Sequence, residues 1–324
     1  MDRAICGMYI AFYASMEQHS EGYLGRDYID ALAQYGRALE LPASQGWLLG
    51  RRIPGHQNEE DACGAYPLFC CRHWNRLAGD LAALEGHLAS CVVITDPFGG
   101  YTQADLRAAF PDMVRPFKEH FIVELDVAPE KIVQAHHRYY TRKALRDYSV
   151  ALCDEPLRLL ERWNQLYSLL IKRHNITGMA MFSPESFAHQ FRIPGVRVFY
   201  AERGGVIEGM QVWFCQGDVA YHHLGAYSEV GYRSCVSYAL MWSALQWFAE
   251  AGTQRVDLGG GAGIGQKEDG LTRFKQGWSN ASQKVYLCGR ILDEKRYAQL
   301  IDDAGQSGVE YFPQYRAVKV PVAV

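Results

Sequence analysis

The sequence predicts an α+β fold, and the order of its segments leads to this class. Three strand-like segments follow one another at residues 196–203, 206–217 and 219–227, with short turns between them. Helical segments flank this antiparallel meander at residues 156–175 and 234–252. A doubly wound sheet would require regular alternation of strands and helices, which the chain does not show. We therefore expect mixed, largely antiparallel sheets flanked by helices.

The first half of the chain shows a looser version of this pattern. Tyr28, Leu32 and Leu39 recur at helical spacing and predict an amphipathic helix. The expected helices of this half are residues 21–41, residues 105–121 with two proline breaks, and residues 129–150. The expected strands are a pair within residues 46–74, joined by a polar loop with Glu59 and Glu60, and single strands within residues 90–101 and 121–125.

The clearest helix of the second half is residues 234–252. Its apolar residues recur every fourth position from Val236 to Phe248, and Gly252 suits a C-terminal cap. A strand that ends in glycines is expected at residues 254–260, followed by a short helix and a last strand at residues 284–292.

Length, charge and cysteine content restrict the class of protein. The 324 residues suggest roughly two domains, and we place the lobes at residues 1–152 and 153–324. A net charge of −3 provides no global field that would attract nucleic acid. Nine cysteines without a CxxC pair or zinc-type spacing indicate reduced thiols, no metal site and a cytoplasmic protein. No signal peptide or long apolar run is found, so no membrane span is expected.

The glycine run at residues 259–265, "GGGAGIG", is a possible phosphate loop, but its spacing does not fit one. GxGxxG fails in every register. Gly260 and Gly265 have P-loop spacing, yet Gln266 stands where the lysine of that motif should be. A nucleotide-binding fold is therefore disfavoured. A flexible turn and an active-site loop both remain open.

Several polar residues are candidates for chemistry, each with a plain structural alternative. Lys275, in "GLTRFKQGW", lies between Phe274 and Trp278, and is either a solvated helix residue or a partly desolvated cation. His222 and His223 lie on one strand and face opposite sides of the sheet. We select His223 as a possible proton shuttle, although a buried, hydrogen-bonded histidine would fit the pattern too. Asp257 ends a strand, where it could simply cap a turn.

Basic residues recur on one predicted helix and could bind phosphates. Arg142 and Arg146 are four residues apart, with Lys143 beside them, so they share one helical face. Such a stripe could contact a tRNA end, a nucleotide diphosphate or CoA, or be an ordinary solvated surface. No spacing typical of a Ser-His-Asp or Cys-His nucleophile is visible, which favours direct transfer over a covalent intermediate.

Residues 90–290 resemble a known family. The segment "HHLGAYSEVGYRSCVSYALMWSALQWFAEAGTQRVDLGGGAG", followed by "GLTRFKQGW", is similar to the C-terminal signature of FemAB-like aminoacyltransferases, which include BioF2-like acetyltransferase domains. Earlier segments, "DPFGGY", "HHRYYTRKALR" and "LYSLLIKRHNITGMAMFSPESF", resemble the family in the same order. The resemblance implies two GNAT-like acyltransferase lobes in tandem, with the transfer site in the second.

The resemblance also implies an activity and several site residues. The activity is transfer of an aminoacyl or acyl group to an amine, with no cofactor besides the activated donor. Lys275, after Phe274, would stabilise charge on the reacting carbonyl or on the donor phosphate. Arg173 would contact phosphate of the acceptor. Tyr227 and Ser228 would lie where the donor binds, and Tyr101 near the cleft of the other lobe; ordinary turn chemistry could explain these three positions equally.

The donor expected from the sequence is aminoacyl-tRNA, with acyl-CoA as the alternative. GNAT proteins that use CoA carry a Q/R-x-x-G-x-G/A turn whose amides bind pyrophosphate. Counting from Arg233, the expected glycine is Val236, so this turn is missing. A non-catalytic binding module on the same fold remains a second hypothesis. The acceptor is expected to be a small-molecule or peptide amine.

Overall fold

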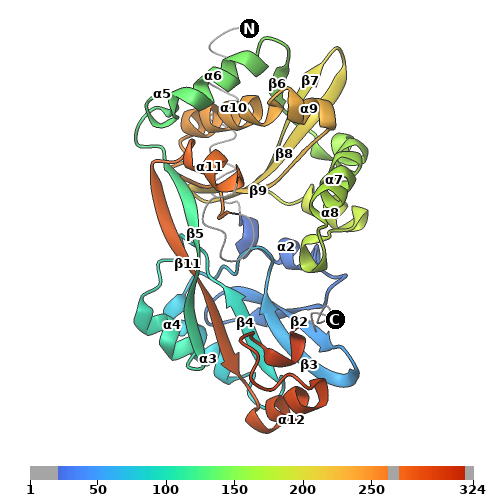
Figure 1. Ribbon diagram of the computed structural model, residues 1–324. Helices are drawn as coiled ribbons and strands as arrows, with labels where there is room; N and C mark the ends of the chain where they lie inside the picture. The colour runs from blue at the N-terminus through green and yellow to red at the C-terminus, as the bar shows by residue number, and fades with distance from the viewer. Residues whose placement is uncertain (1–20, 262–269, 318–324) are drawn as a thin grey trace. The chain divides into compact units, whose positions relative to one another are not determined.

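The computed structural model describes residues 21–261 and 270–317, and the chain divides into two compact units. Unit 1 comprises residues 1–23 and 118–284, and unit 2 comprises residues 24–117 and 285–324. Figure 1 shows the chain with its helices and strands labelled. Each unit is described by itself below.

Unit 1 contains a sheet built around an antiparallel meander. The meander consists of β7 (Val196–Arg203), β8 (Val206–Gln216) and β9 (Val219–Tyr227), and the sequence pattern predicted all three strands. Two short strands and one long strand extend this sheet: β6 (Ser149–Leu152) beside β7, β10 (Arg255–Asp257) beside β9, and β5 (Met113–Glu124) beside β10. β10 is parallel to β9 and antiparallel to β5, so the sheet is mixed.

The helices of unit 1 cover this sheet and bury its large side chains. α10 (Val236–Ala251) packs on the strands β6 to β9, and Gly252, with φ +86°, ends it in the left-handed conformation expected of a C-terminal cap. α6 (Ala135–Ala144) packs on α10, and α7 (Leu160–His174) packs on β8 and β9. The remaining helices are α5 (Pro129–Ile132), α8 (Pro184–Gln190), α9 (Glu229–Arg233) and α11 (Gly270–Gln276). Trp213, Leu240 and Phe248 are fully buried in the core between α10 and the sheet.

In unit 2 the strands pair in the order β1, β2, β3, β4, β11, and the pairing is again mixed. These strands are β1 (Arg37–Leu41), β2 (Gly46–Ile53), β3 (His56–Gly64), β4 (Ser90–Ile94) and β11 (Ala281–Ile291). Only β3 and β4 pair in parallel among the described strands of this sheet. The helices are α2 (Arg26–Asp30), α3 (Leu77–Ala82), α4 (Gln103–Ala109) and α12 (Glu294–Ala304). Trp74, Leu77 and Phe110 lie in its core.

A buried carboxylate joins three parts of unit 2. The Asp61 side chain is 0% exposed. Its Oδ1 accepts a hydrogen bond from Nε of Arg51 at 3.1 Å, and its Oδ2 accepts one from the Tyr315 hydroxyl at 3.0 Å. Nη2 of Arg316 donates to Oδ1 at 3.0 Å. The paired charges offset the cost of burying the carboxylate and attach residues 315 and 316 to the sheet.

Three local predictions for the first half are wrong. Residues 37–41, expected at the end of a helix, form β1 because they pair with β2. Residues 113–121, expected to be helical, belong to β5, which pairs with β10. Glu59 and Glu60 lie in β3 rather than in a loop, because the chain turns already at Pro54 and Gly55.

The two units have different bounds from the lobes expected at residues 1–152 and 153–324. Residues 129–152 belong to unit 1 because β6 pairs with β7 and α6 packs on α10. β5 and β11 each pass from one unit into the other. Within the described ranges, no helix combines the length and the apolarity that crossing a bilayer would need.

Candidate functional site

The candidate site lies in unit 1, where β9 and β10 stop pairing. β10 pairs with β9 only over Val219–Tyr221, and β9 continues for six residues to Tyr227. The register between β8 and β9 shifts here, because Trp213 pairs with His222 and Val212 pairs with Leu224. His223 is therefore the extra residue of a β-bulge, a feature that occurs frequently next to active sites. Beyond β10 the chain enters the glycine run.

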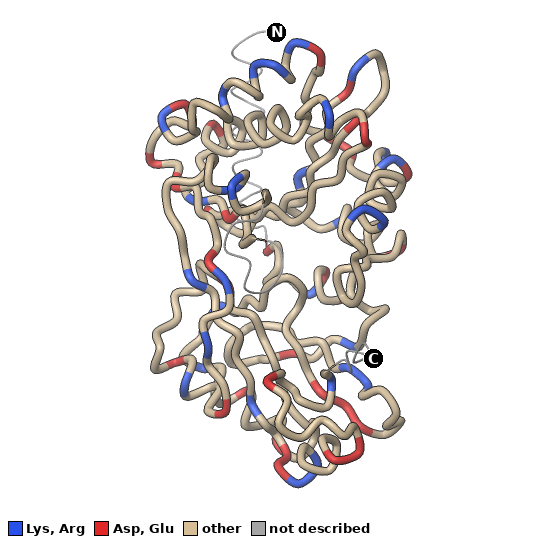
Figure 2. Tube along the Cα trace, viewed as in Figure 1, with Lys and Arg blue, Asp and Glu red and all other residues tan. Residues whose placement is uncertain are grey.

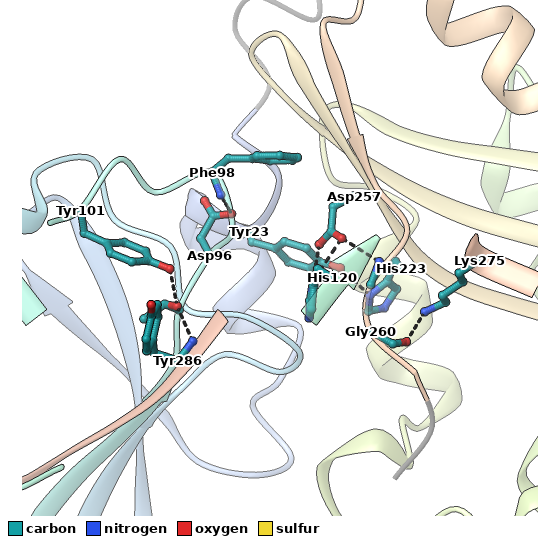
Figure 3. A network of polar contacts seen from close by, with 12 residues as sticks. Tyr23, Asp96, Phe98, Tyr101, His120, His223, Asp257, Gly260, Lys275 and Tyr286 are labelled. Carbon is teal, nitrogen blue, oxygen red and sulfur yellow. Dashed lines mark hydrogen bonds and ion pairs between the residues drawn. The ribbon is translucent and has the colours of Figure 1, made fainter. Parts of the chain in front are cut away.

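Lys275 is a buried cation that contacts the beginning of this glycine run. It lies on α11, is 9% exposed, and its Nζ donates a hydrogen bond to the carbonyl oxygen of Gly260 at 2.7 Å. Figure 3 shows this contact. Phe274 and Trp278, on either side of it in sequence, pack in the core with Tyr238. Lys275 thus has the partly desolvated position that one of its two interpretations requires, and its charge acts there in a lower dielectric than water.

His137 fixes the position of α11. Its Nε2 donates to the carbonyl oxygen of Phe274 at 2.9 Å, which leaves the adjacent Lys275 on a braced turn of helix. The imidazole lies against the rings of Tyr238 and Trp278, with centroids 5.0 Å away in each case. Burial lowers the pKa of His137, so the ring is neutral and has one N–H to donate.

The first glycines of the run are held closely against β5. The N–H of Leu258 donates to the carbonyl of Phe121, and the N–H of Phe121 donates to that of Gly259. Nζ of Lys118 donates to the Gly261 carbonyl at 3.0 Å. A Cβ at position 260 would lie 3.0 Å from Cδ of Lys118 and 3.2 Å from the carbonyl oxygen of Glu119, so the backbone of Gly260 lies close against β5. Residues 259–261 are thus a pinned segment, whereas residues 262–265 of the run lie outside the described residues.

A histidine and an aspartate meet beside the glycines. Nδ1 of His120, on β5, is 2.9 Å from Oδ2 and 3.1 Å from Oδ1 of Asp257, at the end of β10. Both side chains are buried, at 9% and 3% exposure. Oδ1 of Asp257 also accepts a hydrogen bond from the N–H of Gly259 at 2.7 Å. The sequence drew attention to Asp257 only as a possible turn cap and missed His120, because 137 residues separate the two.

His223 is buried and hydrogen-bonded through both ring nitrogens. Its Nε2 is 3.1 Å from Oε1 of Gln190, and its Nδ1 is 2.9 Å from the hydroxyl of Tyr23. Nε2 of Gln190 donates to Ser186, so Oε1 accepts and the His223 proton resides on Nε2. Burial lowers the pKa of His223 to about 3. These contacts fit the buried, hydrogen-bonded alternative, and a proton-shuttle role for His223 stays a prediction.

The charge of Lys275 affects the pKa of His222. Burial, as the largest cause, lowers the pKa of His222 to about 3, and the positive charge of Lys275 contributes to this fall. Its ring lies 4.6 Å from that of Trp213, centroid to centroid. Lys275 and the bulged part of β9 are therefore electrostatic neighbours.

Tyr227 and Ser228 have structural partners at the end of β9. The Tyr227 hydroxyl accepts a hydrogen bond from Nε2 of Gln211 at 3.0 Å, and burial raises its pKa. Ser228 caps α9, because its Oγ accepts from the N–H of Gly231 at 2.9 Å, and its hydroxyl donates to Glu208. These contacts account for both residues as turn chemistry, and donor binding by them stays a prediction.

The segment between β9 and α10, where the CoA-binding turn was sought, is helical. It consists of α9 and a left-handed Cys235 with φ +58°. The N–H groups of Tyr232, Ser234 and Cys235 donate to carbonyls within the segment, at 2.9 to 3.2 Å. These amides are consequently unavailable to wrap a pyrophosphate.

Basic side chains flank this segment on two helices. Arg173, at the C-terminal end of α7, lies over the ring of Tyr232 on α9, 3.9 Å from its centroid. Lys143, on α6, is close enough to Cys235 to counter the rise that burial causes in the pKa of that thiol. Arg142 and Lys143 are exposed on α6, whereas Arg146 is exposed beyond the end of this helix, so the predicted single helical stripe is shorter than expected. Figure 2 shows the distribution of Lys and Arg along the chain.

Tyr101 belongs to unit 2, whereas the other candidates belong to unit 1. Its hydroxyl is 2.7 Å from Oγ1 of Thr95, and its ring packs against Trp74 and Tyr286. Burial, as the largest cause, raises its pKa to about 12. A role for Tyr101 in substrate binding stays a prediction.

Comparison with known proteins identifies the fold. Residues 131–276 match the family model described as acetyltransferase (GNAT) domain. The solved structure of FemX has a TM-score of 0.61 at 13% identity, over 90% of this chain and 98% of FemX. The C-terminal domain (DUF2156) of an Agrobacterium fabrum protein named as a lysylphosphatidylglycerol synthetase has a TM-score of 0.58 at 15% identity, over 93% and 97%. L-PGS from Bacillus licheniformis has a TM-score of 0.55 at 13% identity, over 87% and 96%.

No curated protein matches the sequence. The structural likenesses and the matched domain nevertheless agree on one result. Residues 131–276 match a GNAT domain, and the chain shares its fold with FemX and with the DUF2156 domain. This confirms the fold that the resemblance predicted, with mixed sheets flanked by helices.

Proposed function

We propose that the protein is an N-acyltransferase that moves an aminoacyl group from an activated donor, aminoacyl-tRNA, to an amine acceptor with formation of an amide bond. The observation that carries this proposal is Lys275, a buried cation held 2.7 Å from the Gly260 carbonyl within the matched GNAT domain. The likeness of fold to FemX, and to a domain whose name refers to a lysylphosphatidylglycerol synthetase, supports a transferase of this class.

Lys275 has the chemistry that an acyl transfer requires. Attack of an amine on an ester carbonyl places negative charge on the carbonyl oxygen, and a preorganised cation stabilises that charge most where water is excluded. The backbone carbonyl of Gly260 accepts a hydrogen bond from the ammonium and so fixes its position. Because His137 braces the helix that carries Lys275, little reorganisation is needed during the reaction.

The basic residues around α9 support a donor with phosphates. Arg173 and Lys143 lie on two different helices beside α9 and Cys235. Arg142 and Arg146 extend this charge over the exposed surface of unit 1 near α6. The 3′ end of a tRNA presents several phosphates, and such contacts give binding that weakens steeply with salt.

An acyl-CoA donor is the second candidate, and the description of the matched domain as an acetyltransferase favours it. The internally bonded amides of α9 weigh against it, because a pyrophosphate turn needs free N–H groups. A binding module without catalysis would not require a buried, braced lysine.

The test is transfer of label from defined donors by the purified protein. Pooled radiolabelled aminoacyl-tRNAs and, separately, a panel of labelled acyl-CoA thioesters are incubated with amines from a cell extract. We expect RNase-sensitive transfer from aminoacyl-tRNA, and a fall of roughly 10²–10³-fold in kcat for Lys275→Met, which removes the charge but keeps the length of the side chain.

Lys284→Met is the matched control, because Lys284 is an exposed lysine of the same unit. It should retain the activity of the wild type. Transfer from acyl-CoA alone would overturn the tRNA donor. Equal activity of K275M and wild type would overturn the role of Lys275.

A further inference from the structure

We infer that His120, held by Asp257, is the general base that removes the proton from the attacking amine. This inference rests on the proposed acyl transfer and adds a second functional group to the same site. It comes from the position of the pair, since neither residue lies in the glycine run or in the motif that contains Lys275.

The geometry of the pair is that of an oriented imidazole. Nδ1 of His120 donates to the carboxylate of Asp257, 2.9 Å from Oδ2. The carboxylate is itself fixed by the N–H of Gly259 at 2.7 Å, so it cannot rotate freely. Nδ1 therefore carries the proton, and Nε2 presents a lone pair. Among residues 21–261 and 270–317, Nε2 of His120 has no hydrogen-bond partner, and the side chain keeps 9% exposure.

The dyad and the cation are attached to the same short segment. Asp257 begins the segment Asp257–Gly260, and the carbonyl of its last residue accepts the hydrogen bond from Lys275. Figure 3 shows His120, Asp257, Gly260 and Lys275 around this part of the chain. A base and a cation thus lie at the two ends of four residues, as an acyl transfer to an amine requires.

The two histidines of β9 are unsuited to the same task. Both ring nitrogens of His223 are engaged with Gln190 and Tyr23. Burial holds the pKa of His222 and of His223 near 3, too low to accept a proton efficiently at neutral pH. His120 differs from both because its hydrogen-bond partner is a carboxylate, at 2.9 Å.

Proton transfer through His120 balances the reaction. The amine nitrogen forms a bond with the donor carbonyl carbon, and Nε2 of His120 takes one proton from that nitrogen. The bond between the carbonyl carbon and the leaving oxygen of the tRNA ester then breaks. The imidazolium returns its proton to that oxygen, so the products are an amide and a free hydroxyl, and His120 is neutral again.

Other charged or titratable residues lie on the elements around His120. They are Arg115, Lys118, Glu119 and Glu124 on β5, His222 and His223 on β9, Arg255 and Asp257 on β10, and Arg273 and Lys275 on α11. Lys118 shares a face of β5 with His120, and its ammonium is bound to the Gly261 carbonyl.

The experiment compares His120→Gln and Asp257→Asn with wild type in single-turnover transfer from the donor that wild type accepts, between pH 5 and 9. We expect the rate of H120Q to fall by roughly 10²–10⁴-fold, with donor affinity unchanged within threefold. The acidic limb of the wild-type pH–rate profile should disappear in this variant. His136→Gln, which changes an exposed histidine on α6, is the matched control and should keep both rate and limb.

Two further readouts separate catalysis from folding. Circular dichroism and thermal unfolding show whether H120Q is folded, and nitrogen NMR of the wild-type histidines reports the tautomer independently of activity. We expect His120 to carry its proton on Nδ1. A folded H120Q with the rate and pH profile of wild type would overturn the role of His120 alone. Absence of transfer by wild type from every donor would overturn the proposed function together with this inference.

Discussion

Substitution of Gly277 by alanine tests how tightly the structure holds the helix that carries Lys275. A Cβ at position 277 would lie less than 3.0 Å from three atoms of the His137 ring. The ring cannot move away easily, because Tyr238 and Trp278 contact it and its Nε2 donates to the Phe274 carbonyl. The substitution must therefore displace either the ring or the end of α11.

The expected loss of stability has two parts, overpacking of the core and loss of a hydrogen bond. Overpacking a dense core costs about 1–3 kcal/mol, and loss of the hydrogen bond from His137 to Phe274 costs about 1 kcal/mol more. We expect G277A to lower the free energy of unfolding by roughly 2–4 kcal/mol, or the melting temperature by roughly 4–16 °C for a unit of this size. Because α11 carries Lys275, transfer activity should fall as well.

Urea unfolding followed by tryptophan fluorescence measures this cost. Gly270→Ala is the control on the same helix, because nothing lies within 4 Å of a Cβ at that position. It should be neutral or slightly stabilising. In a His137→Ala background the G277A substitution should cost little, since the obstructing ring is gone. Equal stability of G277A and wild type would refute the packing argument.

Two other predictions concern buried charge. Asp61→Asn should lower the free energy of unfolding by about 3–5 kcal/mol, because it leaves Arg51 and Arg316 facing a neutral group. Chemical denaturation measures this loss, and a loss below 1 kcal/mol would contradict the prediction. His222 and His223, whose pKa values are lowered to about 3, stabilise the fold above the unfolded pKa near 6.5, and this stability is lost as pH falls towards 3. Each histidine should contribute up to about 1.4 kcal/mol per pH unit to this loss of stability. His223→Gln should therefore reduce the fall in the urea midpoint between pH 6 and 4.5. An unchanged fall would be inconsistent with a buried, neutral His223.

Local sequence patterns were sufficient to predict elements whose ends are marked by turn or capping residues. The meander strands β7, β8 and β9 occur at the predicted residues because turns bound each run of apolar and aromatic side chains. α10 ends at Gly252 because that residue adopts the left-handed conformation that a C-terminal cap needs. The antiparallel meander between helices, and with it the α+β class, followed from these signals.

Other elements form only because they pair with strands distant in the sequence, so local patterns could not predict them. Residues 113–121 contain a proline and mixed side chains, yet they form a strand because β5 lies between β11 and β10 in the strand order. Residues 37–41 were assigned to a helix from the spacing of apolar side chains, yet they form a strand because they pair with β2. In both cases tertiary pairing overrides a weak local preference.

In the candidate site, too, some residues could be predicted from local sequence and others only from the tertiary structure. Lys275 could be proposed from its place between aromatic residues and from a family resemblance, both of which are properties of a short segment. His120 and Asp257 are 137 residues apart, and their contact arises only because β5 and β10 pair in antiparallel. Burial of Lys275 against the Gly260 carbonyl likewise requires α11 to fold back on the glycine run. Composition and spacing report the chemical groups a chain possesses, whereas the distances between those groups and their exposure to water are set by packing.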